Sequence, residues 1–540
     1  MERIFYNARL HARSGVLPQT ALAVERGRIC ALDSDEALLA HAENGTECVD
    51  LGGRTVYAGF ADTHMHLLHF GVTLTEAELK DARSVEEVKH IIREFIDKNH
   101  VPAGTAVYAH GWNQDLFDDR HIPTRQDLDE VSMEHPIVAS RICGHLATGN
   151  TAALAHFDIT AQTRVPGGEV LLDKNGVPNG VLTENAVNLF YQSGSDVPVE
   201  RVMDILRTSS AYAASRGITS VHSDDLHAMT GCSAQTVIEA YRRLAEADEL
   251  SVRVNEQCQL LNDDEFNWFF DAGYGVCKTF GTFRLNSRKI IADGSLGGRT
   301  AYLREPYADD PVTCGVLCYT AQELDKMVLQ AHERNVPVAV HAIGDRAMEL
   351  VLDAIEKAQK ARPDLHPRHG VVHCQITDEG LLDRFRNLGV QAYVQPVFLE
   401  YDAHIAAARV GERLAATSYN WKSLLERGVN VSGGSDCPVE SMDSLPNLYC
   451  AMTRMDFEGK PEGGFHPEQN LTAQQALELF TCNAAAASGD EDHRGDLRVG
   501  FDADLTILER DFFDVPARQV KDIPVYMTVM NGKIRYRAGA

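Results

Sequence analysis

The residues with the clearest capacity for chemistry are two histidines at the end of an apolar run, in the sequence Asp62-Thr63-His64-Met65-His66. Side chains two positions apart on a strand point to the same side, so both imidazoles can reach one cation. Taken alone, this pair is equally consistent with two partly buried histidines that have no special role. The residues that end later apolar runs are what favour a metal site.

Further residue types that bind metals end the later runs. His341 ends VPVAVH, His373 ends GVVH and Asp436 ends VSGGSD, each after β-branched residues. Histidine and aspartate are ligands of zinc-like cations, and several of them at the ends of neighbouring strands are hard to explain as isolated core residues. Lys289, inside SRKIIADG, lies in another such run, where an ion pair in the barrel interior would explain an unmodified lysine.

The elements that carry these residues alternate between short apolar runs and amphipathic helical patterns from about Gly217 to Asp436. Together with a first strand that begins at Thr55, the runs predict eight parallel strands, each followed by a helix. This pattern predicts the α/β class and a (β/α)8 TIM barrel over residues 59–485. In such a barrel the C-terminal ends of the strands carry the chemistry.

Two regions fall outside the barrel repeat. Residues from about 101 to 184 hold strand-like runs of their own (TAVYAHGW, PIVASRICGH and GGEVLLD), and we interpret them as an insertion after the first barrel strand and helix. Both ends of the chain are rich in strands, and Asn531-Gly532 between alternating apolar residues predicts a hairpin. Residues 1–58 and 486–540 are therefore expected to form a small composite β-sandwich.

The composition of the chain argues against some classes of binding partner. The chain has 540 residues, 44% of them apolar, and a formal net charge of −27, which would repel phosphate backbones and anionic membranes. No run approaches the roughly 18 apolar residues of a membrane span, and the first residues lack the apolar segment of a signal peptide. We expect a cytoplasmic homodimer that acts on a small molecule, with neither nucleic acid nor a membrane as a partner.

The order HxH, Lys, His, His and Asp along the predicted strands resembles the metal-dependent hydrolases of the amidohydrolase superfamily. Longer phrases are similar to its branch of N-substituted formamide deformylase and YtcJ-like proteins: GWNQDLFDDRHIPTRQDLD, RICGHLATGN, NGVLTENA, ADGSLGGRTAYL and HAIGDRA. The resemblance runs from about Leu51 to the terminal hairpin. It implies an enzyme that hydrolyses an amide, formamide or related carbon–nitrogen bond other than a peptide bond, with one or two zinc ions per chain.

The resemblance also implies roles for individual residues. His64, His66 and Asp436 would bind one zinc ion, and His341 and His373 a second, with Lys289 carboxylated to a carbamate that bridges both ions. Without that modification, the alternative is a single metal held by His64, His66, Asp436 and His341. Asp436 would also take the proton from the nucleophile and pass it to the leaving nitrogen.

Six further side chains are expected to bind substrate: Trp112, Asn113, His145, His222, Arg299 and Gln395. The first three lie in the insertion, where structural packing and polar contacts explain them equally well. The others lie at or just after the second, fourth and seventh predicted strands, where they would line the pocket. Asp345, four residues past His341, is expected to cap the following helix, with orientation of a ligand imidazole as the alternative.

Two other classes of function remain open. A metal-dependent deaminase of this superfamily usually has a glutamate shortly after the histidine of the fifth strand, but HAIGDRAM has none there, and Lys289 favours the two-metal hydrolases. A non-catalytic barrel that serves as a scaffold would typically have lost metal ligands, whereas every ligand position is filled here. A measurement of bound zinc separates a scaffold from an enzyme.

Overall fold

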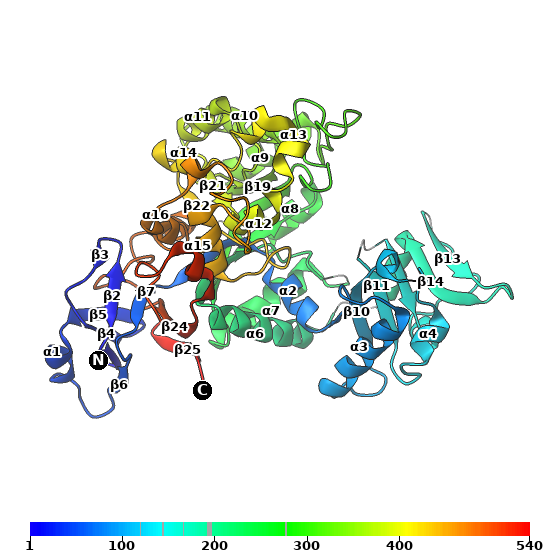
Figure 1. Cartoon of the computed structure of the whole chain (residues 1–540), viewed down its shortest axis with the longest axis horizontal. Helices are drawn as coiled ribbons and strands as arrows, with labels where there is room; N and C mark the ends of the chain where they lie inside the picture. Colours follow the sequence, from blue (N-terminus) through cyan, green and yellow to red (C-terminus); the bar gives the residue numbers. More distant parts are fainter. Residues whose placement is uncertain are drawn as a thin grey trace. The chain divides into compact units, whose positions relative to one another are not determined.

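The computed structural model describes residues 1–118, 120–142, 145–165, 167–191, 197–229, 231–275 and 278–539 (Figure 1). The chain divides into two compact units: the first comprises residues 1–67, 206–226 and 241–540, and the second comprises residues 68–205 and 227–240. The segment at about 101–184 that the sequence marks as an insertion lies within the second unit.

The first unit is built on a TIM barrel, as the alternation of strands and helices predicts. Among the described residues its wall consists of eight parallel strands: β8 (Phe60–Met65), β15 (Ile218–Ser223), β16 (Arg253–Gln259), β18 (Phe283–Ile291), β19 (Val338–Ala342), β20 (Gly370–His373), β21 (Gln391–Val394) and β22 (Val431–Gly433). Neighbours in this order pair in parallel register. The short strand β17 (Thr279–Phe280) pairs antiparallel with β18 outside the wall.

Helices alternate with these strands: α6 (Val199–Ser215), α7 (Ala234–Glu246), α8 (Asp263–Asp271), α9 (Ala321–Glu333), α10 (Asp345–Ala361), α11 (Glu379–Leu388), α12 (Leu399–Asp402), α13 (Ala406–Ala415), α14 (Trp421–Glu426), α15 (Ser444–Thr453), α16 (Ala473–Leu479) and α17 (Cys482–Ser488). Local signals explain their ends. A capping box of Thr320 and Glu323 begins α9, and Gly389 in the left-handed conformation ends α11. In the described ranges, none of the helices combines the length and the apolar character that crossing a membrane requires.

Both ends of the chain contribute to a β-sandwich. One sheet contains β5 (Arg28–Asp33), β4 (Ala21–Glu25), β1 (Arg3–Tyr6) and β6 (Glu47–Asp50); the other contains β25 (Lys533–Arg537), β24 (Val525–Met530), β23 (Leu505–Leu508), β7 (Thr55–Ala58), β2 (Arg9–Ala12) and β3 (Gly15–Val16). Phe5 and Leu22 of the first sheet share one buried core with Ile507 of the second. The predicted hairpin joins β24 and β25, and Asn531 and Gly532 have the positive φ angles, 54° and 72°, that its turn requires.

The apolar run that begins at Thr55 is two strands, so the expectation of a single first strand is wrong. Its first part, β7, pairs with β2 and β23 in the terminal sheet, whereas barrel strand β8 begins at Phe60. Gly59 lies between them, and a Cβ atom there would lie 2.2 Å from Thr219 Oγ1. Glycine fits this position between the two sheets because a side chain here would collide with Thr219.

Contacts between the first and last barrel strands close the wall. The backbone N–H of Asp436, just after β22, donates to His64 O at 2.8 Å. The Asp62 carboxylate accepts hydrogen bonds from the backbone N–H of Ser435 at 3.1 Å and from its hydroxyl at 2.5 Å. The ends of the first and last strands therefore lie side by side.

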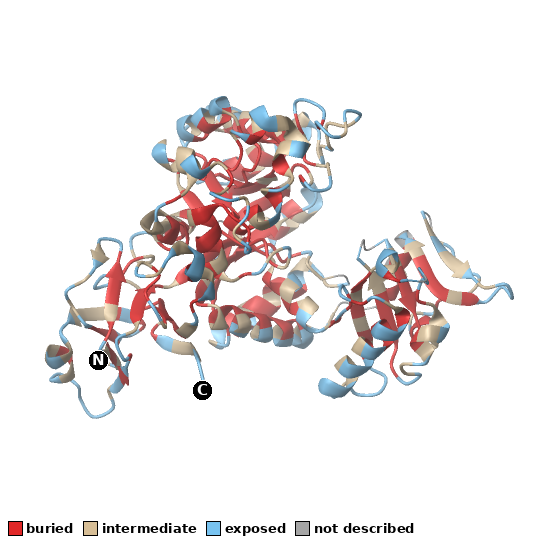
Figure 2. Ribbon diagram, viewed as in Figure 1, coloured by how far each residue is buried: buried red, intermediate tan, exposed pale blue. Residues whose placement is uncertain are grey.

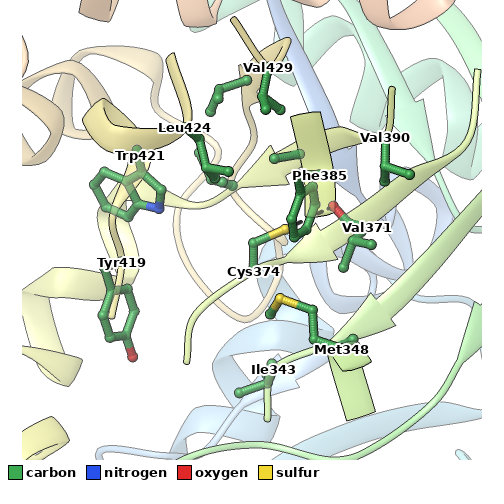
Figure 3. Close-up of a cluster of buried hydrophobic side chains, with 14 of the residues drawn as sticks. Ile343, Met348, Val371, Cys374, Phe385, Val390, Tyr419, Trp421, Leu424 and Val429 are labelled. Carbon is green, nitrogen blue, oxygen red and sulfur yellow. Dashed lines mark hydrogen bonds between the residues drawn. The ribbon is translucent and has the colours of Figure 1, made fainter. Parts of the chain in front are cut away.

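The main core of the first unit lies between the barrel wall and its helices. Val371 of β20, Phe385 of α11, and Trp421 and Leu424 of α14 are completely buried in it (Figure 3). Figure 2 shows buried strands and helices with exposed outer faces. Because packing fills the outer side of the wall, the polar side chains at the C-terminal ends of the strands are the ones available for chemistry.

The second unit contains a mixed sheet of β13 (Gly168–Leu172), β14 (Pro178–Glu184), β12 (Leu146–Gly149), β11 (Ile137–Arg141), β10 (Val107–Trp112) and β9 (Ala77–Glu78), in that order. Its helical segments are α2 (Leu67–Leu74), α3 (Val85–Lys98), η1 (Gln114–Leu116), α4 (Arg125–Asp129), α5 (Thr151–His156) and η2 (Asn185–Tyr191). Ser84 caps α3, whose Val88 and Ile92 are buried in the core against this sheet. The three strand-like runs of the insertion correspond to β10, β11 and β13.

Candidate metal centre

Six side chains that the sequence marks as metal ligands lie in the C-terminal halves of barrel strands of the first unit or just after the strand ends: His64, His66, Lys289, His341, His373 and Asp436. Two of them have unusual backbone conformations, with φ of 79° at His373 and 60° at Asp436. A non-glycine residue adopts positive φ at a cost in free energy, and such residues gather at functional sites.

Asp436 lies at the centre of this group. Its Oδ1 is 3.3 Å from His64 Nε2 and 3.2 Å from His66 Nε2. His64, His373 and Asp436 are buried, and one ligand atom from each lies within 4.8 Å of the other two. Two imidazoles and a carboxylate converging in this way match the donor set of a zinc-type site, so the residues present fit a bound divalent cation.

Two glutamine side chains hold the rings of this cluster. His64 Nδ1 donates to Gln257 Oε1 at 2.7 Å, and His373 Nδ1 donates to Gln395 Oε1 at 2.8 Å. A proton on Nδ1 leaves the lone pair of Nε2 for a cation. Gln395, expected to bind substrate, thus contacts the proposed ligand His373. Gln257 was not predicted, although a glutamine inside an otherwise buried strand is a signal for such a role.

Lys289 forms an ion pair with Asp224, a residue that the sequence analysis did not single out. Lys289 Nζ lies 3.0 Å from Asp224 Oδ2 and 3.4 Å from His64 Nε2. The lysine and aspartate side chains are 2% and 4% exposed. The backbone carbonyl of Asp224 also accepts a hydrogen bond from His66 Nδ1 at 2.9 Å. Its place one residue past the end of β15 was the signal that could have identified it.

His341 uses the opposite nitrogen. Its ring lies edge-on to that of His373, with 4.4 Å between the ring centroids. Its Nε2 donates to the carbonyl of Gly294 at 3.1 Å and lies 3.4 Å from Asp293 Oδ1. This hydrogen bond places the proton on Nε2, which leaves Nδ1 of His341 for a cation.

Asp345 does not cap α10, so that expectation is wrong. Gly344 occupies the cap position with extended backbone angles, and Asp345 is the first helical residue. The carboxylate of Asp345 accepts a hydrogen bond from the backbone N–H of Arg304 at 3.0 Å. The side chain beside the His341 ring is that of Asp293 instead.

The pKa values of Asp436, His64 and His66 indicate which of these side chains carries a proton. Burial raises the pKa of the Asp436 carboxyl, but the adjacent rings of His64 and His66 outweigh that effect and hold the pKa well below its usual range. Burial and the charge of Lys289 lower the pKa of His64 to about 4. For His66, burial also lowers the pKa, but Asp436 and Asp224 together raise it to about 9. The metal-free site at neutral pH therefore holds a cationic His66, whose proton a divalent cation would replace.

Two more of the expected substrate-binding residues belong to the first unit. The His222 side chain is 1% exposed, with its ring 6.2 Å from that of Tyr393, and its Nδ1 has no hydrogen-bond partner in the described part of the chain. The guanidinium of Arg299 pairs with Asp309 at 2.9 Å. Substrate binding by His222 and Arg299 stays a prediction.

The remaining three belong to the second unit, and each has a structural partner there. Trp112 is fully buried and donates its Nε1–H to Ala139 O at 3.0 Å. Asn113 caps η1 with its side chain. His145 is exposed, with Nδ1 2.9 Å from Glu184 Oε2. Their binding of substrate also stays a prediction.

Known proteins resemble this chain over nearly its whole length. The profile of the Amidohydrolase family matches residues 47–536. Over 520 residues, 96% of each chain, the sequence is 32% identical to YtcJ of Bacillus subtilis. It is 26% identical over 534 residues to the N-substituted formamide deformylase of Arthrobacter pascens, covering 96% of this chain and 94% of that protein. An uncharacterized metal-dependent hydrolase from Pyrococcus horikoshii has a similar crystal structure, with a TM-score of 0.79 and 25% identity over 95% of this chain and 99% of that one.

Proposed function

The chain belongs to the amidohydrolase family, and from this premise we propose that it hydrolyses amide, formamide or related carbon–nitrogen bonds, other than peptide bonds, in small molecules. One observation carries the proposal: ligand atoms of the buried His64, His373 and Asp436 converge within 4.8 Å at the C-terminal ends of barrel strands. That edge of a TIM barrel is where catalysis takes place in this architecture. The deformylase among the relatives supports a carbon–nitrogen bond as the target.

Zinc is the proposed metal, with one or two ions per chain. His64, His66 and Asp436 would hold one ion, and His341 and His373 would hold the second. An ammonium group cannot ligate a metal, so Lys289 would have to be carboxylated to bridge the two ions. The ion pair of Lys289 with Asp224 is the arrangement of the unmodified side chain, in which a single ion is the expected content. Modification of Lys289 would therefore favour two ions over one.

The residues of the chain supply orientation and proton transfer. A divalent cation held here would supply Lewis acidity, which polarises a scissile carbonyl and makes a water molecule more acidic. Asp436 Oδ1 contacts the rings of His64 and His66, which leaves Oδ2 to take the proton of the attacking water and deliver it to the leaving nitrogen. Gln257 and Gln395 keep their histidines in one tautomer throughout.

A substrate screen tests this proposal. Zinc-loaded protein is incubated with N-formyl compounds, N-acyl compounds and dipeptide-like compounds, and release of the amine is measured. The matched control is the same preparation stripped of metal by a chelator and then reloaded. We expect amine release that disappears with the metal and returns on reloading. Absence of bound zinc after loading, together with no hydrolysis of any compound, would show that the proposed function is wrong.

A further inference from the structure

A buried carboxylate lies beside the metal-ligand cluster without being one of its proposed ligands. Asp293 follows β18, four residues past Lys289, and its side chain is completely buried. Its Oδ1 accepts a hydrogen bond from Ile343 N at 3.0 Å, and its Oδ2 accepts from Gly344 N and Tyr302 N, each at 2.8 Å. A buried charge is costly unless such hydrogen bonds satisfy it, so Asp293 has a specific reason to be there.

The groups that Asp293 binds belong to two segments that pack tightly. Ile343 and Gly344 form the turn between β19 and α10, and Tyr302 belongs to the loop after β18. The carbonyl of Tyr302 accepts hydrogen bonds from the N–H groups of Arg346 and Ala347, both at 3.1 Å, in the first turn of α10. A Cβ atom at Gly344 would lie 2.1 Å from that carbonyl oxygen, so a larger residue could not form this contact. Asp293 thus ties the loop to the turn that directly follows His341.

The same carboxylate faces the His341 ring. Within the described part of the chain, His341 is the one basic side chain within ion-pair distance of Asp293, at 3.4 Å from Nε2 to Oδ1. The adjacent carbonyl of Gly294 accepts the Nε2 proton at 3.1 Å. A carboxylate and a carbonyl both favour a protonated Nε2, and a negative charge beside an imidazole strengthens its other nitrogen as a ligand.

We propose that Asp293 is a positioning residue for His341, which it holds in place through the following turn and in the tautomer whose Nδ1 lone pair faces the metal site. The inference deepens the proposed function and rests on it. It also gives a role to Asp293, the acidic residue of ADGSLGGRTAYL, the motif that also holds Arg299.

Zinc affinity in the full-length protein is the first test. Metal-free wild type and Asp293→Asn are titrated with zinc against a competing chelator. The matched control is Asp345→Asn, which removes another carboxylate at the start of α10 that pairs with Arg304 rather than with His341. We expect Asp293→Asn to bind the zinc that depends on His341 about 10- to 100-fold more weakly, and Asp345→Asn to stay within about twofold of wild type. Wild-type affinity in Asp293→Asn would overturn the inference.

A double-mutant cycle separates positioning from general destabilisation. His341→Ala and the double variant Asp293→Asn/His341→Ala are titrated in the same way. If Asp293 acts through His341, Asp293→Asn should weaken zinc binding by less than about twofold in the His341→Ala background. Full additivity of the two losses would mean that Asp293 acts on the site by another route, and the inference would fail.

A measurement on unsubstituted protein covers the case in which Asp293→Asn does not fold. Metal-free wild type labelled with 15N-histidine reports the tautomer of each ring by NMR, and the His341 signals are those missing from His341→Ala. We expect a proton on Nε2 and none on Nδ1, and a proton on Nδ1 would contradict the proposal. This readout needs no metal and no substrate, so its failure is distinct from a failure of the proposed function.

Discussion

The imidazole of His66 joins two strands that lie far apart in the chain: its Nε2 is 3.2 Å from Asp436 Oδ1, across 370 residues of sequence. Its Nδ1 donates to the carbonyl of Asp224, after a third strand, at 2.9 Å. The histidine is therefore held at both nitrogens in the metal-free protein. Binding of a cation would exchange the proton on Nε2 for the metal and leave the contact at Nδ1 in place.

Removal of both histidines of the first strand should abolish metal binding. The double variant His64→Ala/His66→Ala is expected to lose its zinc and its activity while keeping the far-ultraviolet circular dichroism of the fold. The reason is that these rings contribute two ligands of the same ion. Metal content is measured by mass spectrometry after loading and desalting, with His90→Ala, an exposed residue of α3, as the control. Full metal content in the double variant would refute the site assignment.

Lys289→Ala should destabilise the fold as well as change the site. It leaves Asp224 buried, 4% exposed, without its cation, and breaking a buried ion pair in this way costs about 3–5 kcal/mol. The double variant Lys289→Met/Asp224→Asn should recover most of the free energy of unfolding, which urea titration measures.

If Lys289 is carboxylated, metal-free wild type should regain activity faster when bicarbonate accompanies zinc, and Lys289→Ala should hold one ion fewer. A recovery rate independent of bicarbonate would favour the single-metal site.

Asp436→Asn should separate ligation from proton transfer. The amide retains an oxygen that can contact a cation but is not a base, so turnover should fall on the order of 10²-fold or more. Metal content and KM should change much less, and the acidic limb of the pH–rate profile should disappear. Turnover near the wild-type rate would make Asp436 a structural ligand only. Another group would then carry the proton, with His222 the first to substitute.

A buried histidine pair predicts a loss of stability in acid. His369 Nδ1 accepts a hydrogen bond from Val338 N at 3.1 Å, and its Nε2 lies 2.9 Å from His332 Nδ1. Burial, together with the neighbouring His332, lowers the pKa of His369 to about 3, compared with about 6.5 in the unfolded chain. The unfolded state thus binds more protons between these values, so this residue stabilises the fold above pH 6.5 and that contribution falls as the pH drops towards 3.

Urea titrations at pH 6.5 and pH 5.0 measure this effect. His369→Asn should lose about 1.6 kcal/mol less stability than wild type between the two values, since the unfolded histidine is already half protonated at pH 6.5 and takes up the rest of its proton by pH 5.0. His366→Asn, an exposed residue of the same loop, should behave as wild type does. If the free energy of unfolding of His369→Asn depended on pH as that of wild type does, the histidine pair would not contribute to the acid sensitivity between pH 6.5 and pH 5.0.

The proposed ligand residues could be selected from the sequence because the relevant pattern is local. An apolar β-branched run followed by histidine or aspartate marks the end of a barrel strand, and parallel strands of one barrel bring their ends to the same edge. His64, His341, His373 and Asp436 needed no knowledge of their neighbours to be found. The terminal hairpin was equally local, because Asn531-Gly532 carries its own turn preference.

The partners of those ligands are decided by tertiary structure. Gln257, Asp224 and Asp293 lie in or after other strands, and which of them meets a given ring depends on the register between strands. The split of the first apolar run at Gly59 likewise depends on Thr219, which lies far along the chain. The periodicity of apolar residues in the sequence indicates only which face of its own strand or helix a side chain occupies. Contacts between segments hundreds of residues apart arise only when the barrel closes, because packing and hydrogen bonding then select one register among those that the pattern allows.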